Sequence, residues 1–157
     1  MSAAILSPRP THPPTQSDGD DFGLPGWIYH DRDFFELEKR SIFRTSWQLV
    51  CHSNDIPELG DYHRFDVFDE SVVTVRGKDG QLRSFHNVCR HRASRLLDGQ
   101  KGNCGHLIQC PYHHWSYSLE GKLIGVPQRT SFNGLDMESR GLVALEQEIF
   151  KIGRAHV

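Results

Sequence analysis

The sequence has no long apolar run, few cysteines and almost no excess of charge of either sign. No stretch of its 157 residues is apolar for long enough to span a bilayer, and Ala3–Leu6 is too short for the core of a signal peptide. A net charge of −2 gives no reason to expect nucleic-acid or membrane binding. Four cysteines are too few for a disulfide framework, so a reducing, cytoplasmic location is expected.

The length suits one domain, or one domain with a tail. Residues 1–26 are rich in Pro, Ser, Thr and Asp and predict a flexible tail, because such a composition cannot bury a core. Residues 152–157 read as the translation of a common sequencing-adapter stretch, so we expect them to be an artefact. Residues 27–151 are the expected domain, and the true protein is expected to diverge near Lys151.

Within this domain the patterns predict one helix followed by short strands. Asp31 can cap a helix over about 31–44, where apolar residues recur at near-helical spacing. Lys78–Gly80 and Leu119–Gly121 are hairpin turn signals. The expected strands are 47–52, 62–68, 71–76, 82–88 and 106–110. We therefore predict a mainly β protein, a small antiparallel structure preceded by one N-terminal helix.

Two short motifs offer metal ligands of mixed type. Cys89-Arg-His91 is followed after eighteen residues by Cys110-Pro-Tyr-His113. A [2Fe–2S] cluster with two Cys on one iron and two His on the other uses this ligand set, and zinc also accepts it. Zinc fingers usually take a Cys pair and a His pair from separate elements, whereas each motif here is mixed. The cluster is therefore favoured, with a structural zinc site as the alternative.

The residues around these ligands carry a family resemblance. Asn87–Leu96, Cys110–Tyr117 and Gly121–Leu123 resemble the Rieske domain of ring-hydroxylating oxygenase large subunits, and the resemblance runs from about Trp27 to Phe150. It implies a small antiparallel β-sandwich with two cluster-binding hairpin loops. It also implies that Cys89 and Cys110 hold one iron and His91 and His113 the other. Arg92, Tyr112 and Trp115 would surround the cluster, where the aromatic rings could shield it from water.

The chain departs from that family's pattern at two positions where glycine is usual, Ala93 and His114. If the backbone there is left-handed, alanine costs roughly 1–2 kcal/mol, while histidine tolerates it better. We therefore expect loops that form under slight strain.

High-potential Rieske proteins of respiratory complexes resemble the chain at the ligands but differ around them. Their loop disulfide would need cysteines at Ser94 and Tyr112, and their hydroxyl donor would fall at Trp115. Fewer donors to the sulfurs predict a potential on the order of −150 mV. Because the resemblance places the histidine ligands facing outward, the potential should fall as the pH rises into the alkaline range.

Other residues could compete for a metal but are not favoured. Cys104-Gly-His106 is interpreted as part of a turn over residues 102–105, and Cys51 as a small buried hydrophobe. His86 and His91 have the spacing that the family uses for its mononuclear iron, but Arg83 stands where a carboxylate is needed. Arg90, Arg92, Arg95 and Lys101 cluster near the first motif. A solvated loop is the favoured interpretation of this cluster, with a docking patch for an acidic redox partner as the other.

The resemblance implies an electron-transfer function. The domain would pass electrons from a flavin-dependent reductase or a ferredoxin to a mononuclear Fe(II) in a separate C-terminal catalytic domain, absent from this chain. The whole protein would then be a mono- or dioxygenase large subunit, a homotrimer that hydroxylates, including at aromatic rings, or N-demethylates a small organic substrate. No 2-His-1-carboxylate triad is found in the sequence. The alternatives are a stand-alone Rieske ferredoxin and a zinc-stabilised interaction module.

Overall fold

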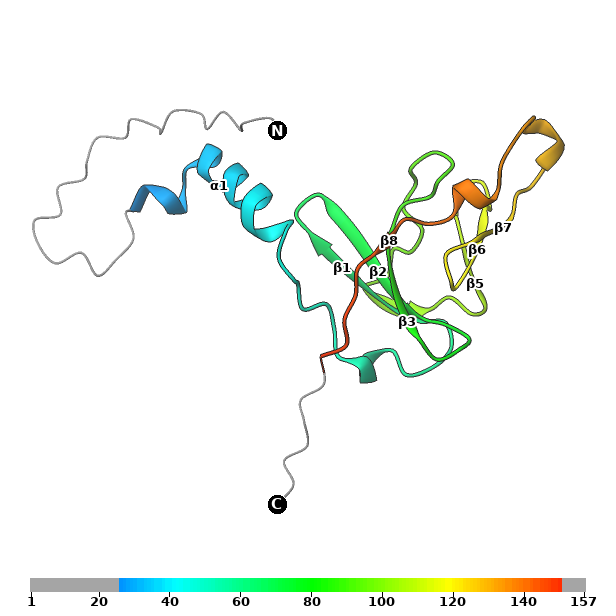
Figure 1. Ribbon diagram of the computed structural model, residues 1–157, viewed down its shortest axis with the longest axis horizontal. Coiled ribbons are helices and arrows are strands. Elements are labelled where there is room, and N and C mark those ends of the chain that lie inside the picture. The colour runs from blue at the N-terminus through cyan, green and yellow to red at the C-terminus, as the bar shows by residue number, and fades with distance from the viewer. Residues whose placement is uncertain (1–25, 151–157) are drawn as a thin grey trace, which may run out of the picture. The chain divides into compact units, whose positions relative to one another are not determined.

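The structure, a computed structural model, describes residues 26–150 (Figure 1). The chain divides into two units, Met1–Gln48 and Leu49–Val157, which are described separately. Residues 1–25 of the predicted tail and all of the predicted artefact at 152–157 lie outside the described residues. Among residues 26–150, no helix is both long enough and apolar enough to cross a membrane.

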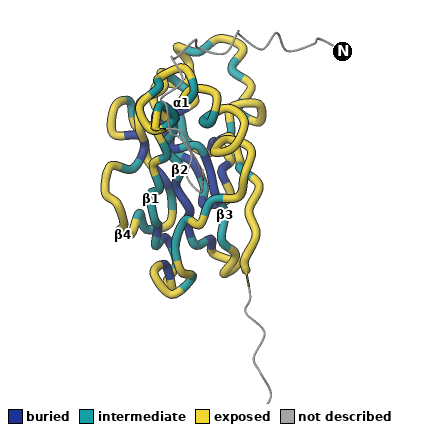
Figure 2. The backbone as a smooth tube through the Cα atoms, turned by 90° about the vertical axis from the view of Figure 1, so that its left-hand side faces the viewer, coloured by how far each residue is buried: buried dark blue, intermediate teal, exposed yellow. Residues whose placement is uncertain are grey.

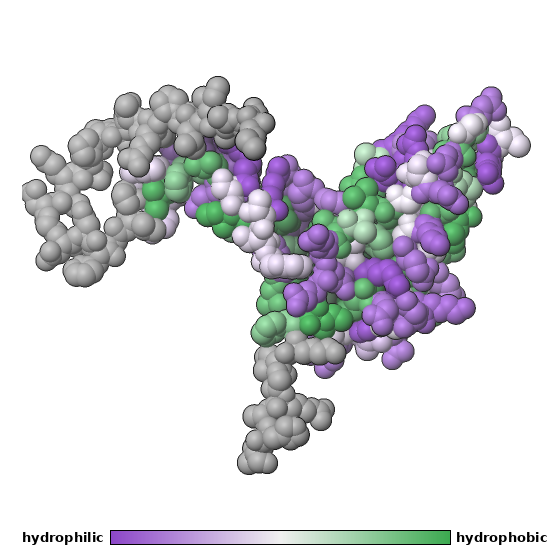
Figure 3. Space-filling model, viewed as in Figure 1, coloured by the Kyte–Doolittle hydropathy of each residue, from purple (hydrophilic) through white to green (hydrophobic). Residues whose placement is uncertain are grey.

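The N-terminal unit contains the expected helix. A 3-10 turn, η1 (Gly26–Tyr29), precedes α1 (Arg32–Glu38), which continues as a π-helical segment, η2 (Lys39–Phe43). The predicted cap is present, because the Asp31 carboxylate accepts a hydrogen bond of 2.7 Å from the backbone N–H of Phe34. These elements bury no residue, and apolar side chains remain exposed along them (green in Figure 3).

The second unit is built from two antiparallel sheets (Figure 1). The larger has the strand order β4-β1-β2-β3-β8 and the smaller the order β5-β6-β7. Their bounds are β1 (Asp61–Val67), β2 (Glu70–Arg76), β3 (Leu82–His86), β4 (Lys101–Asn103), β5 (Leu107–Gln109), β6 (Ser116–Ser118), β7 (Leu123–Gly125) and β8 (Ala144–Leu145). Short 3-10 turns lie at η3 (Ser53–Asp55), η4 (Arg129–Ser131) and η5 (Glu138–Arg140). The predicted mainly β, antiparallel class is confirmed.

Four predicted strands correspond to β1, β2, β3 and β5, but the strand predicted at 47–52 is wrong. That segment pairs with no strand of the described chain, and Trp47 and Leu49 are exposed. β-propensity alone does not form a strand where no neighbouring strand pairs with the segment. The turn predicted over 102–105 is also partly wrong. Lys101–Asn103 pairs with β1 as strand β4, and the turn follows at Gly105 and His106.

The core lies between the sheets, and runs of buried residues occur in β2 and β3 (dark blue in Figure 2). Val73, Val75 and Phe85 contribute from the larger sheet. The smaller sheet contributes Ile108, Tyr117 and Leu123.

Both predicted hairpin turns are present, and the turn between β6 and β7 packs against the larger sheet. Gly121 has a φ of 85°, and a Cβ at this position would lie 2.5 Å from the ring of Phe85. Glycine is therefore required at position 121 for two reasons: the turn needs a positive φ, and the smaller sheet approaches the larger one too closely for a Cβ.

Candidate metal centre

The two predicted motifs form loops with the same hydrogen-bond pattern. Loop 1 (residues 89–94) follows β3, and loop 2 (residues 110–115) joins β5 to β6. In loop 1 the Cys89 carbonyl accepts from the N–H of Ala93 at 3.0 Å, and the Cys89 N–H donates to the Ser94 carbonyl at 2.8 Å. In loop 2 Cys110 makes the equivalent bonds with His114 and Trp115, at 3.0 and 2.8 Å. The loop therefore fixes both the backbone N–H and the backbone carbonyl of each cysteine by hydrogen bonds.

The same turn requires a left-handed residue four positions after each cysteine. Ala93 has a φ of 54° and His114 a φ of 58°. These are the positions where the sequence lacks the usual glycine, so the expected strain is present in both loops. Alanine bears the larger cost, roughly 1–2 kcal/mol, because its Cβ crowds the following carbonyl in this conformation.

The two cysteine side chains lie together in the core. Cys89 and Cys110 are almost fully buried, and the Cys110 side chain lies close enough to Cys89 to act on its thiol. Burial raises the pKa of the Cys89 thiol above its ordinary value, and the neighbouring Cys110 raises it further. The Tyr117 hydroxyl and the His91 backbone N–H act in the opposite direction. Such a pair of buried thiols becomes a pair of thiolates most readily when a metal supplies the compensating charge.

The two histidine side chains form a second pair. The ring centroids of His91 and His113 are 4.7 Å apart, with the planes at 71°. The Nδ1 atom of His91 is buried and has no hydrogen-bond partner. Burial, followed by charge on His113 and Arg92, lowers the pKa of His91. A neutral imidazole with a buried, unpartnered nitrogen is the form in which histidine binds a metal.

These two pairs test which metal group fits. Within residues 26–150, no three Cys, His, Asp or Glu side chains converge closely enough to hold a single metal ion. The two pairs fit the ligand set of a two-iron cluster, which would take the cysteine pair on one metal and the histidine pair on the other.

The three residues predicted to surround the cluster differ in how they contact the two histidines. The Trp115 ring stacks on His91 at a centroid distance of 4.7 Å and an angle of 7°. The Tyr112 ring lies 3.7 Å from that of His113 but is 59% exposed. Arg92 is exposed and influences His91 through its charge. Of the three, Trp115 is the buried one and covers a face of a candidate histidine ligand.

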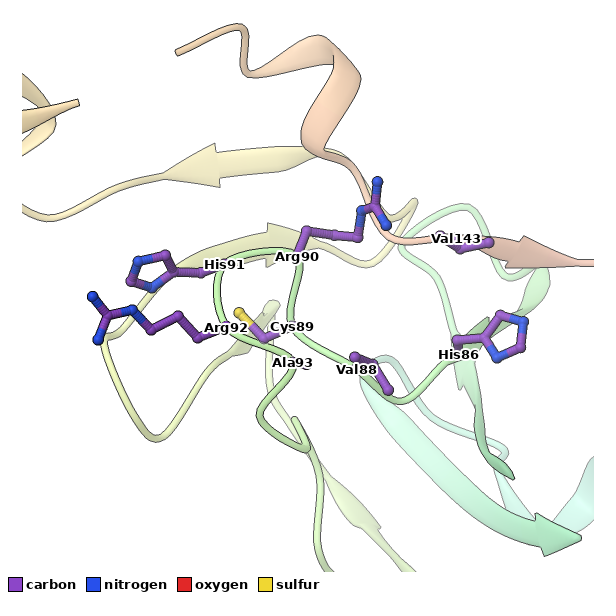
Figure 4. A pocket seen from close by; sticks show the side chains of 8 residues that line it. All are labelled: His86, Val88, Cys89, Arg90, His91, Arg92, Ala93 and Val143. Atoms are coloured by element: carbon purple, nitrogen blue, oxygen red, sulfur yellow. The ribbon is translucent and has the colours of Figure 1, made fainter. Parts of the chain in front are cut away.

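A surface pocket of about 460 Å³ runs along loop 1. Figure 4 shows the Cys89 sulfur inside the curve of the loop, with the Arg90 and Arg92 side chains pointing away on opposite sides. The pocket is lined by His86, Val88, Cys89, Arg90, His91, Arg92, Ala93 and Val143. The surface beside the candidate ligands is therefore basic and partly apolar.

Sequence reasoning missed two residues at this site, Tyr117 and Phe132. The Tyr117 hydroxyl lies 3.3 Å from Cys89 Sγ, so one hydroxyl donor to a sulfur is present although position 115 is a tryptophan. Burial raises the pKa of Tyr117 well above its ordinary value, so the hydroxyl keeps its proton. Trp115, at the end of loop 2, and Tyr117, in β6, are two residues apart, and this spacing was a signal that both face inward. Nothing in the sequence pointed to Phe132.

Cys104 and His86, two of the competing residues, have partners other than the four candidate ligands. The Cys104 thiol donates a hydrogen bond to the Gly60 carbonyl at 3.2 Å, and burial raises its pKa to about 11. Cys51 is half-buried. The Nδ1 atom of His86 lies 3.7 Å from a carboxylate oxygen of Glu70.

Comparison with known proteins gives a match over most of the chain. A family model described as the Rieske [2Fe–2S] domain matches residues 46–143. The carnitine monooxygenase oxygenase subunit of Escherichia coli K12 is 38% identical over 125 residues, covering 80% of this chain and 33% of that protein. The glycine betaine monooxygenase oxygenase subunit of Chromohalobacter salexigens is 42% identical over 117 residues, covering 74% of this chain and 24% of that protein.

Solved structures agree with the sequence relatives. A quaternary ammonium Rieske monooxygenase in complex with L-carnitine has a TM-score of 0.75 at 38% identity, covering 80% of this chain and 35% of that one. Naphthalene 1,2-dioxygenase with bound indole has a TM-score of 0.72 at 32% identity, covering 78% and 28%. The chain spans no more than about a third of the length of these relatives, and the matched region includes both loops.

Proposed function

The chain belongs to the Rieske [2Fe–2S] domain family, and we propose that it is the electron-transfer part of an oxygenase large subunit. The observation that carries the proposal is the division of four ligands into a buried cysteine pair and a histidine pair with an unpartnered buried nitrogen. When bound, the cluster would supply one-electron redox chemistry. Cys89 and Cys110 would hold one iron, and His91 and His113 the other.

The chain's own side chains would tune and protect this group. The Tyr117 hydroxyl accepts a hydrogen bond from the Arg90 N–H at 3.0 Å, so its proton is available to the Cys89 sulfur. Trp115 covers one face of the His91 imidazole and excludes water from it. The exposed, basic rim of loop 1 would attract a redox partner with an acidic surface, such as a flavin-dependent reductase or a ferredoxin.

The whole protein would use these electrons at a mononuclear Fe(II) in a catalytic domain, within a homotrimer. The relatives include monooxygenases named for carnitine and glycine betaine and a 2-aminobenzenesulfonate 2,3-dioxygenase from Alcaligenes. The expectation of aromatic ring hydroxylation is therefore too narrow. We propose O2-dependent oxidation of a small organic substrate, with quaternary ammonium compounds as the class to assay first.

Two measurements test the proposal. The purified chain, reconstituted with iron and sulfide, should hold two irons, be coloured and be reduced by dithionite, and its reduced form should show two nitrogen ligands by pulsed EPR. A colourless, zinc-containing chain that dithionite does not change would support the interaction module instead.

Sequencing the gene beyond the codon for Lys151 separates the oxygenase subunit from the stand-alone ferredoxin. A reading frame that continues into a 2-His-1-carboxylate motif supports the oxygenase. A stop codon directly after Val157 would support the carrier.

A further inference from the structure

The candidate ligand His91 and two aromatic side chains, Trp115 and Phe132, form a cluster of three rings. Trp115 stacks on the face of the imidazole at 4.7 Å and 7°, and Phe132 approaches it edge-on at 5.6 Å and 80°. Trp115 and Phe132 also contact each other, at 5.7 Å and 75°. Each ring thus touches the other two, and the imidazole is held in two perpendicular directions.

Phe132 reaches this position from a distant segment of otherwise polar residues. It follows η4, a turn in which the Phe132 N–H donates to the Arg129 carbonyl at 3.0 Å. Its neighbours Ser131 and Asn133 are exposed, while Phe132 itself is half-buried and packs against the core. The turn therefore presents one apolar side chain, and that side chain contacts a ligand.

Packing is what orients the His91 ring. Histidine ligands are usually oriented by a hydrogen bond to the second ring nitrogen. No hydrogen bond to the His91 side chain is found within residues 26–150, and its buried Nδ1 has no partner. The terminal torsion of histidine is broad, so without hydrogen bonds the surrounding rings must select its angle.

We propose that Phe132 is a positioning residue that, together with Trp115, fixes the plane of the His91 imidazole at the cluster. The inference rests on the proposed function, because it requires His91 to bind iron. His113 provides the internal comparison. Its aromatic neighbour Tyr112 is mostly exposed, so loss of the Phe132 ring should disturb His91 and leave His113 unchanged.

The test is pulsed EPR on the cluster-loaded, dithionite-reduced 157-residue chain, which reports the couplings of the two ligand nitrogens separately. In Phe132→Leu, one of the two couplings should shift and broaden, while the other should match the unaltered protein. Phe132→Tyr retains the ring and should restore the original spectrum. Phe65→Leu is the matched control, because it removes a half-buried phenylalanine from β1 of the larger sheet. It should change neither coupling.

Spectra of Phe132→Leu and the unaltered protein that superimpose would overturn this inference and leave the proposed function intact. Absence of two nitrogen couplings in the unaltered, loaded protein would overturn both. If Phe132→Leu does not retain the cluster, Phe132→Met and Phe132→Tyr are compared instead. The measured quantity is the rate at which a chelator of Fe(II) removes iron from each variant. A several-fold faster loss from Phe132→Met supports the proposal, and equal rates contradict it.

Discussion

The Tyr117 hydroxyl lies 3.3 Å from the sulfur of Cys89, in a part of the core where Tyr117 has no exposed surface. The hydroxyl oxygen already accepts a hydrogen bond from the Arg90 N–H. One phenol therefore links the backbone of loop 1 to the sulfur that the loop carries.

The first prediction concerns this hydroxyl. Tyr117→Phe should lower the reduction potential of the cluster, because a donor that stabilises extra electron density on the sulfur is lost. A hydrogen bond to a charged group that differs by about 1 kcal/mol between redox states corresponds to roughly 40 mV for a one-electron couple. Potentiometric titration followed by EPR measures the shift. An unchanged potential in a fully loaded variant would show that the hydroxyl does not act on the sulfur.

The second prediction separates ligand cysteines from bystanders. Cys89→Ser should abolish the visible absorption and the bound iron, because one iron loses a buried thiolate ligand. Cys104→Ser is the matched control, since its thiol is also partly buried but bonds to the Gly60 carbonyl. It should retain the iron content of the unaltered protein, as measured by metal analysis after reconstitution. Equal iron loss in both variants would reject the ligand assignment.

The third prediction concerns the left-handed positions. Ala93→Gly should stabilise the loaded chain by about 0.5–1 kcal/mol, because glycine relieves the strain while raising the entropy of the unfolded chain. The thermal midpoint, at a fixed heating rate, should rise by roughly 2–4 °C. His114→Gly should give a smaller rise. Ala144→Gly on β8 is the control and should lower the midpoint, and a fall in all three variants would contradict the strain argument.

The fourth prediction concerns the basic rim of loop 1. Arg90, Arg92 and Arg95 are exposed, and none has a carboxylate within ion-pair distance in the described part of the chain. Oxidation of the reduced cluster by ferricyanide, an anion, should slow as ionic strength rises. Oxidation by tris(phenanthroline)cobalt(III), a cation, should become faster.

Stopped-flow absorbance of charge variants measures this effect. Arg92→Gln should slow the ferricyanide reaction several-fold at low salt. Lys78→Gln, which removes an exposed charge from the β2–β3 turn, should not. Identical rates in the two variants would remove the basis for an acidic partner at this surface.

The fifth prediction concerns the β2–β3 hairpin and its dependence on pH. Arg83 donates two hydrogen bonds to the Asp79 carboxylate, at 2.9 and 2.6 Å, and holds the pKa of Asp79 well below its ordinary value. A lowered pKa means that the pair stabilises the fold above the ordinary Asp pKa and that this stabilisation is lost as the pH falls below it. Asp79→Asn should therefore destabilise the chain slightly at pH 7 and have less effect near pH 3. Thermal midpoints at both pH values measure this, and an equal effect at both would contradict it.

The four candidate ligands could be predicted from the sequence because chemistry constrains them locally. Mixed Cys-x-His and Cys-x2-His motifs place one ligand of each kind on each loop, which suits two metals better than one. The left-handed backbone at Ala93 and His114 was expected only from the family resemblance, in which glycine is usual at both positions. Period-two alternation and turn residues identified the longer strands, β1, β2 and β3.

Other features depended on tertiary structure. Strands of two or three residues, such as β8, have too little sequence to show a period, and only their partners define them. The strand predicted at residues 47–52 is wrong because β-propensity was present there but no neighbouring strand pairs with the segment.

The sequence by itself determined which atoms can bind a metal and the order in which the loops present them, because ligand type and turn geometry are local properties. Only the tertiary structure decided that the cysteines pair in the core and that the described residues 26–150 offer no hydrogen bond to the His91 side chain. It likewise decided that Tyr117 and Phe132 complete the site. The physical reason is that these contacts join residues far apart in the chain, and their distances exist only once the two sheets have packed.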